Sequence, residues 1–402
     1  MANVSGENRI LLIAASIGSG HMKAAEAIAD EIRRVNPGAF VEVVDFTMWQ
    51  VSWATAFMKS CYLFMLKFIP NLYELMYRFT GGKSGGLSVQ SLVSMITSHD
   101  IKNLTRKYEP NLVICTHPFP AGAASWRKGN HPDEFGLATV ITDYSVHQMW
   151  IYHHVDAYFV ARASMKMDLV AAGIPNETIF VTGIPIGRKF SVAIDPDRVR
   201  DEFGLDADRP CVLIMGGGLG LGGVDMALKE MAKIERSLDV IVVTGKNEKL
   251  YSRATTLANE MSGHHHVVVF GFTDRVRELM GVSSFVITKP GALTISEALS
   301  AELPMLLHEP IPGPETENAV YVSREGAALW VNSGEKLGEA IRFCLSSDER
   351  LAAMRQRAHE LKRPYAARDI VGALSVILDR FMDFKKITNG KVSGRDFESR
   401  GE

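Results

Sequence analysis

Short runs of β-branched and aliphatic residues alternate with longer amphipathic stretches along this chain, and this alternation constrains the fold more than any other feature. Parallel α/β sheets produce such a pattern, because the crossover between neighbouring strands is usually a helix. In the first half, strands are expected at residues 10–15, 41–46, 112–116, 137–142, 158–161 and 179–182. In the second half, they are expected at residues 211–215, 240–244, 267–270, 285–288 and 305–308. Because the pattern begins again after residue 210, we predict an α/β chain with two Rossmann-like domains.

Prolines and charged residues concentrate in residues 186–210, which makes this stretch the candidate hinge. The N-terminal domain is then expected in residues 1–190 and the C-terminal domain in residues 205–365. Residues 366–385 are predicted to form a helix that returns to the N-terminal domain. The polar residues 386–402 are expected to form a flexible tail.

The composition is that of two soluble globular domains. The chain has 402 residues, of which 47% are hydrophobic and 22% charged, with a net charge of −2. This apolar content excludes a disordered chain, and the balanced charge gives no overall reason to expect nucleic acid. Four scattered cysteines without a C-x-x-C pair favour reduced thiols in the cytosol. We recognise no secretory signal and no apolar run of about eighteen residues that would predict a membrane span.

Residues 48–80 depart from the α/β pattern, because aromatic side chains there are interleaved with lysines and arginines and Glu74 is the only acid. Such a composition suits an interfacial helix on an anionic bilayer. The alternative is that these aromatic residues simply pack on the first domain. The candidate membrane-contacting residues are Trp49, Trp53, Phe57, Phe64 and Phe68.

The turn Gly18-Ser19-Gly20-His21 follows the first expected strand and precedes a helix expected at about residues 22–35. Open α/β sheets bind their ligands at the carboxyl ends of the strands, and glycines let a ligand approach the backbone there. His21 is a candidate general base, because imidazole accepts a proton near neutral pH. The alternative is a histidine that only caps the helix.

A second glycine-rich turn occupies residues 216–223, after the first strand of the second half. It contains a G-x-G-x-x-G match, but the next strand ends Val243-Thr244-Gly245 without the acid that dinucleotide binding requires. Nicotinamide and flavin enzymes are therefore disfavoured. The free backbone N–H groups of such a turn still suit a diphosphate, and no Walker lysine follows.

Two later loops carry polar groups that suit a nucleotide sugar. Residues 289–297 follow a strand, and their backbone amides, Lys289 and Thr294 are candidate phosphate contacts, with Glu297 a candidate partner of a ribose diol. Residues 310–318 carry carboxylates and an amide, which sugar hydroxyls require as partners. Taken singly, each loop is equally explained as an ordinary strand–helix connection.

Polar groups also follow two strands of the first domain, in Thr116-His117-Pro118 and in residues 142–154. The second stretch contains His147, His153 and His154, which raises a metal hypothesis. These histidines lack an H-E-x-x-H pattern and a neighbouring carboxylate cluster, so a metal site is disfavoured.

Taken together and in this order, these motifs resemble the monogalactosyldiacylglycerol synthases and bacterial processive diacylglycerol glucosyltransferases. That family is related to the lipid-linked N-acetylglucosaminyltransferase of peptidoglycan synthesis. The resemblance covers residues 10–370 and includes Thr288-Lys289-Pro290-Gly291 and the Pro310-x-Pro312-Gly313-x-Glu315 loop. It implies two Rossmann-like domains facing a cleft, the GT-B arrangement. It also implies inverting, metal-independent transfer of a hexose from UDP-glucose or UDP-galactose to diacylglycerol or a related lipid.

The resemblance assigns roles to individual residues. His21 becomes the base on the acceptor hydroxyl, and residues 48–80 become the acceptor and membrane-docking segment. The implied donor-binding residues are Gly217, Gly218, Lys289, Gly291, Thr294, Glu297, Glu315 and Asn318. The candidate acceptor-binding residues are Gly20, His117, His147 and Trp150. No cofactor or metal is implied, and the enzyme is expected as a peripheral protein on the cytoplasmic face of an anionic membrane.

Two positions depart from the family pattern. Ser19 stands where the family usually has a glycine, and Pro314 stands where it usually has a glutamine, which removes an amide that could contact the sugar. Two alternatives to diacylglycerol glycosylation follow. One is transfer to another lipid acceptor, such as a polyprenyl-linked one, and the other is a degenerate relative that binds a nucleotide sugar and regulates a partner.

Overall fold

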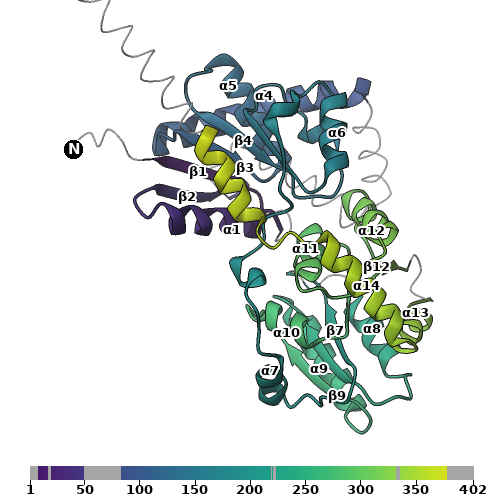
Figure 1. Ribbon diagram of the computed structural model, residues 1–402. Helices are drawn as coiled ribbons and strands as arrows, with labels where there is room; N and C mark the ends of the chain where they lie inside the picture. The colour runs from purple at the N-terminus through teal and green to yellow at the C-terminus, as the bar shows by residue number, and fades with distance from the viewer. Residues whose placement is uncertain are drawn as a thin grey trace, which may run out of the picture.

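The computed structural model describes residues 8–16, 20–48, 83–218, 220, 223–331 and 336–377. Within them the chain forms two six-stranded parallel sheets, one in each half. This arrangement confirms the predicted α/β fold. The two domains lie one above the other in Figure 1, with the N-terminal domain at the top.

The N-terminal sheet has the strand order β2-β1-β3-β4-β5-β6. Its strands are β1 (Arg9–Ala14), β2 (Phe40–Asp45), β3 (Leu112–Cys115), β4 (Gly136–Val140), β5 (Ala157–Val160) and β6 (Ile179–Val181). The helices around it are α1 (Gly20–Val35), α4 (Lys83–Tyr108), α5 (Pro118–Asn130) and α6 (Ala163–Ala171). Apolar runs such as Leu11–Ala14 of the first strand are fully buried, because a parallel sheet is covered by helices on both faces.

The C-terminal sheet has the order β12-β11-β10-β7-β8-β9. Its strands are β7 (Cys211–Met215), β8 (Asp239–Val243), β9 (His266–Phe270), β10 (Phe285–Thr288), β11 (Met305–Leu307) and β12 (Ala328–Trp330). Its helices are α8 (Val224–Met231), α9 (Glu248–Met261), α10 (Val276–Val282), α11 (Ala292–Ser300), α12 (Pro314–Arg324), α13 (Leu337–Leu345) and α14 (Asp348–Leu361). The prediction missed β12, because this edge strand has only three residues and no β-branched run.

The chain crosses between the domains twice. The predicted hinge is partly helical, since it contains the short helix η3 (Arg188–Ser191) and α7 (Pro196–Phe203). The return crossing leads into the helix 366–377, yellow in Figure 1, whose Ile370 and Leu374 pack in the same apolar cluster as Leu12 and Ile28. The two crossings touch at Gly183, where a Cβ would lie 2.5 Å from Cβ of Arg363.

Candidate active site between the domains

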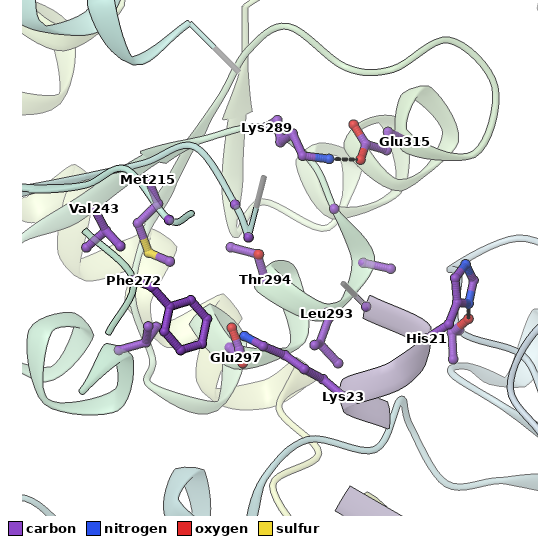
Figure 2. Close-up of a pocket in the computed structure, with 18 of the residues that line it drawn as sticks. His21, Lys23, Met215, Val243, Phe272, Lys289, Leu293, Thr294, Glu297 and Glu315 are labelled. Atoms are coloured by element: carbon purple, nitrogen blue, oxygen red, sulfur yellow. Dashed lines mark hydrogen bonds and ion pairs between the residues drawn. The ribbon is translucent and has the colours of Figure 1, made fainter. Parts of the chain in front are cut away.

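A cavity lies between the carboxyl edges of the two sheets. Its wall on the N-terminal domain is made by Gly20, His21, Lys23, Thr142 and Asp143. The opposite wall is made by the loops that follow β7, β8, β9 and β10 and by the start of α11. The parallel topology explains this convergence, because every strand of such a sheet ends at the same edge. Figure 2 shows His21 and Phe272 on opposite sides of the cavity.

His21 is the second residue of α1, and its ring is held on one side. Its Nδ1 lies 2.8 Å from the carbonyl oxygen of Thr116 and 2.8 Å from Oγ1 of Thr142. A carbonyl oxygen only accepts hydrogen bonds, so Nδ1 carries the proton of the neutral ring and Nε2 carries the lone pair. Burial lowers the pKa of His21 to about 4, against the opposing effect of the Thr116 hydrogen bond. The ring is therefore neutral at physiological pH and able to accept a proton.

The predicted acceptor-binding residues separate into two groups. Gly20 lines the cavity, and its Cα faces Leu293 at the start of α11. His117, His147 and Trp150 are not part of the cavity lining. His117 is buried behind His21, with the ring centroids 4.6 Å apart, and caps α5 by accepting from Phe119 N. His147 accepts from Met149 N at the start of the short helix η1 (Gln148–Trp150), and Trp150 is buried.

Glycine-rich loops form part of the cavity wall on the C-terminal domain. Gly217 and Gly218 follow β7 and line the cavity together with Gly245, which follows β8. Gly217 and Gly245 have φ values of 69° and 64°, which favour glycine. A Cβ on Gly245 would lie only 2.6 Å from the carbonyl oxygen of Gly217. The two loops can therefore touch only because Gly245 carries no side chain.

Charged side chains line the cavity together with these glycine loops. Lys289, after β10, forms an ion pair with Glu315 at the start of α12 (Figure 2). The second oxygen of Glu315 accepts from Ile311 N at 2.9 Å. Glu297 of α11 is buried, which raises the pKa of its carboxyl, while the charges of Lys23 and Lys189 act in the opposite direction. Gly291 and Thr294, at the start of α11, complete this side of the cavity.

Asn318, a predicted partner of sugar hydroxyls, is not among the residues that line the cavity. The residue is fully buried, and its Oδ1 accepts from Tyr144 N of the N-terminal domain at 2.9 Å. Its Nδ2 donates to Asp143 Oδ1 and to Pro290 O, both at 3.4 Å. All the polar atoms of this amide are thus used within the protein.

The contacts around Asn318 join the two domains, and we call Tyr144, Ser296, Asn318 and Tyr321 the interdomain clasp. The Tyr144 hydroxyl lies 2.8 Å from Oγ of Ser296, and its ring stacks on that of Tyr321 with the centroids 5.0 Å apart. Arg162 donates to the carbonyl oxygen of Tyr144 and covers the Tyr321 ring. The Asn318 amide therefore makes contacts between the two domains, whereas the local sequence motif alone predicts a contact with the ligand.

Eleven of the residues that line the cavity were not among the predicted site residues, and Lys23, Thr142, Asp143 and Phe272 are four of them. Lys23 projects from α1 toward Glu297, and Phe272 after β9 is 60% exposed (Figure 2). Thr142 and Asp143 follow β4, in a stretch noted only for its polar groups. Burial raises the pKa of Asp143 to about 6, although its Asn318 hydrogen bond opposes this. The available signal was that Thr142 and Asp143 begin a run, residues 142–154, that belongs to the family pattern, and that Phe272 follows a strand, but the sequence assigned none of the four a role in the site.

The predicted membrane-contacting residues Trp49, Trp53, Phe57, Phe64 and Phe68 lie outside the described residues. In the described part of the chain, no helix combines the length and apolar character needed to cross a membrane. The described residues also contain no group of three or more histidine, cysteine or acidic side chains that could hold a metal ion.

Comparisons with known proteins identify the family. Residues 21–186 match the family model of monogalactosyldiacylglycerol (MGDG) synthase, and residues 211–370 match that of the glycosyltransferase family 28 C-terminal domain. A processive diacylglycerol beta-glucosyltransferase of Bacillus cereus is 31% identical over 366 residues, which cover 91% of this chain and 93% of that protein. The chain belongs to this family of glycosyltransferases. A Staphylococcus carnosus protein of the same name is 28% identical over 392 residues, 97% of each chain.

Solved structures support the fold of this glycosyltransferase. MurG of Acinetobacter baumannii superposes with a TM-score of 0.61 at 15% identity, covering 92% of this chain and 99% of that one. The MnaA protein of S. aureus, solved with UDP, gives a TM-score of 0.61 at 13% identity, covering 92% and 97%. The predicted GT-B arrangement of two Rossmann-like domains is confirmed.

Proposed function

We propose that this enzyme transfers a hexose from a UDP-sugar to diacylglycerol at the cytoplasmic surface of a membrane, with inversion and without a metal ion. The observation that carries the proposal is the placement of His21, whose neutral ring lines the same cavity as the glycine loops and Lys289. A proton acceptor thus faces a wall suited to a diphosphate. The names of the matched family model and of the relatives support the lipid acceptor.

The donor binds on the C-terminal domain. Backbone N–H groups of Gly217 and Gly218 and of the amino end of α11, which begins directly after Gly291, hold the diphosphate, assisted by Lys289 and the Thr294 hydroxyl. These groups supply the positive potential that a metal ion would otherwise supply to the leaving group. Glu297 binds the ribose hydroxyls.

Glu315 holds Lys289 in place through the ion pair, and its oxygens remain close enough to the cavity to accept from a hexose hydroxyl.

The reaction is a single displacement. Nε2 of His21 accepts the proton of the acceptor hydroxyl as its oxygen attacks the anomeric carbon. The bond from that carbon to the diphosphate oxygen breaks, and UDP leaves with the electron pair. Because attack and departure take place on opposite faces of the sugar, the anomeric configuration inverts. General-base catalysis of this kind contributes about 10²–10⁴-fold to the rate.

The acceptor enters from the N-terminal domain, where Gly20 and His21 form the cavity wall. His117, whose ring contacts that of His21, and His147 act as helix caps, and Trp150 is buried. The aromatic segment 48–80 docks on an anionic membrane and delivers the lipid. UDP-glucose and UDP-galactose are both candidate donors, because the relatives are named glucosyltransferases and the family model is named for a galactolipid.

The test uses purified protein, diacylglycerol in anionic liposomes, and radiolabelled UDP-glucose or UDP-galactose in separate reactions. A labelled glycolipid is expected with at least one donor. It should be absent with His21→Ala and retained with His131→Ala, which removes an exposed histidine of the same domain. Binding of UDP without any glycolipid product from diacylglycerol would overturn the acceptor assignment. Transfer to a polyprenyl-linked acceptor in parallel reactions would then identify the alternative.

A further inference from the structure

The hydroxyl of Thr142 makes a contact that the proposed reaction has not yet used. Thr142 lies two residues after β4 and is 6% exposed. Its Oγ1 lies 2.8 Å from Nδ1 of His21 and 3.3 Å from the carbonyl oxygen of Thr116. In return, the Thr116 hydroxyl donates to the carbonyl oxygen of His21 at 3.0 Å. The ends of β3 and β4 and the start of α1 therefore meet at one imidazole ring.

The hydrogen count at this contact has one consistent solution. The Thr116 carbonyl has no proton, so Nδ1–H donates to it. The Thr142 oxygen receives a second branch of the same N–H, and its own proton points to the Thr116 carbonyl. Each polar group in the triangle is then satisfied, and Nε2 is left as the accepting nitrogen of the ring.

We propose that Thr142 is a positioning residue: the Thr116 carbonyl oxygen fixes the Nδ1–H tautomer of His21, and the Thr142 hydroxyl fixes the orientation of the ring, so that Nε2 faces the acceptor hydroxyl. This inference rests on the proposed function, in which His21 is the base.

Other neighbours do not replace this contact. Many catalytic histidines are oriented by a carboxylate, but among the described residues no carboxylate hydrogen-bonds to His21. Asp143, the nearest carboxyl in sequence to Thr142, bonds instead to Asn318. His117 meets the ring edge-on and adds no hydrogen bond that would define its rotation. Without the Thr142 hydroxyl, the single bond to Thr116 O lets the ring tilt.

The variant Thr142→Val tests this role, because valine keeps the β-branched shape and removes only the hydroxyl. The kcat should fall about tenfold or more, as part of the general-base contribution is lost. The KM values for donor and lipid, and the affinity for UDP, should stay close to those of the wild type, because the donor wall is unchanged. Thr142→Ser restores the hydroxyl and should recover most of kcat.

Thr139 offers a matched control. It lies in β4, it is fully buried, and its hydroxyl has no hydrogen-bond partner among the described residues. Thr139→Val thus removes a buried hydroxyl close to Thr142 without touching His21, and its kcat should equal that of the wild type. Thermal melting of all variants establishes that each is folded.

The outcomes separate this inference from the proposed function. If His21→Ala turns over like the wild type, the base assignment fails and the role of Thr142 fails with it. If His21→Ala is inactive while Thr142→Val keeps its kcat, only the positioning role is overturned. It is also overturned if Thr142→Val loses UDP affinity along with kcat and Thr142→Ser recovers neither. A fall in kcat alone, reversed by serine, supports it.

Discussion

The interdomain clasp makes a quantitative prediction about Asn318. Replacing this residue by leucine keeps the size of the side chain and removes its amide. The Tyr144 N–H, which donates to Asn318 Oδ1 in the closed arrangement, then has no acceptor in a buried site. When the domains separate, the same N–H can bond to water. The substitution therefore penalises the closed form and spares the open one.

The size of the penalty follows from that single group. A buried N–H without a partner costs about 1–3 kcal/mol, which corresponds to roughly a fivefold to 150-fold shift in the ratio of closed to open molecules. If the reaction takes place only in the closed form, kcat/KM falls in proportion to the closed fraction that is lost. Saturating UDP-sugar should recover part of the loss, because a donor in contact with both walls favours closure.

Small-angle scattering measures the opening of the domains, and steady-state kinetics measures its effect on kcat/KM. Asn318→Leu should increase the radius of gyration in the absence of ligand and lower kcat/KM about tenfold. Asn259→Leu is the matched control, since Asn259 is exposed on α9 and its side chain makes no contact with the N-terminal domain. If the Asn318→Leu variant scatters like the wild type and binds UDP-sugar more weakly but UDP equally well, Asn318 does not stabilise the closed arrangement. Its amide would then contact the sugar, as the sequence predicts.

Three further predictions concern charge, pH and loop geometry. Lys23→Met should weaken UDP binding about tenfold and make it less dependent on salt, whereas Lys23→Arg should bind UDP like the wild type. Titration calorimetry at two ionic strengths measures both effects. Because burial lowers the pKa of His308 to about 4, the fold should lose stability as the pH falls below about 6.5, by about 2 kcal/mol at pH 5. His308→Leu should therefore melt with a smaller acid shift than the wild type. Gly245→Ala should separate the glycine loops and abolish UDP binding in a chain that still melts cooperatively.

The strand pattern explains why much of the cavity could be anticipated. In a parallel sheet, residues that follow different strands converge on one edge, so His21, Gly217 and Lys289 could be expected near one another from their positions alone. The central strands were also predictable, because their apolar runs are short, are rich in β-branched and aliphatic residues and end at glycine-containing turns. The short edge strand β12 was not, since pairing with β11 rather than local preference determines it.

Local sequence patterns do not reveal hydrogen bonds between residues that lie far apart in the chain. Asn318 and Thr142 show this in opposite ways. The carboxylates and the amide of residues 310–318 predict contacts with a ligand. The Oδ1 atom of Asn318 instead accepts a hydrogen bond from Tyr144 N, which lies 174 residues away in the chain. Thr142 begins a run of the family pattern to which no role was assigned, yet it contacts His21, which lies 121 residues away in the chain. In both cases the partner is decided by how the two sheets, and the ends of β3 and β4, are brought together. Residue type determines which hydrogen bonds a side chain can make, and tertiary packing determines which of them it makes.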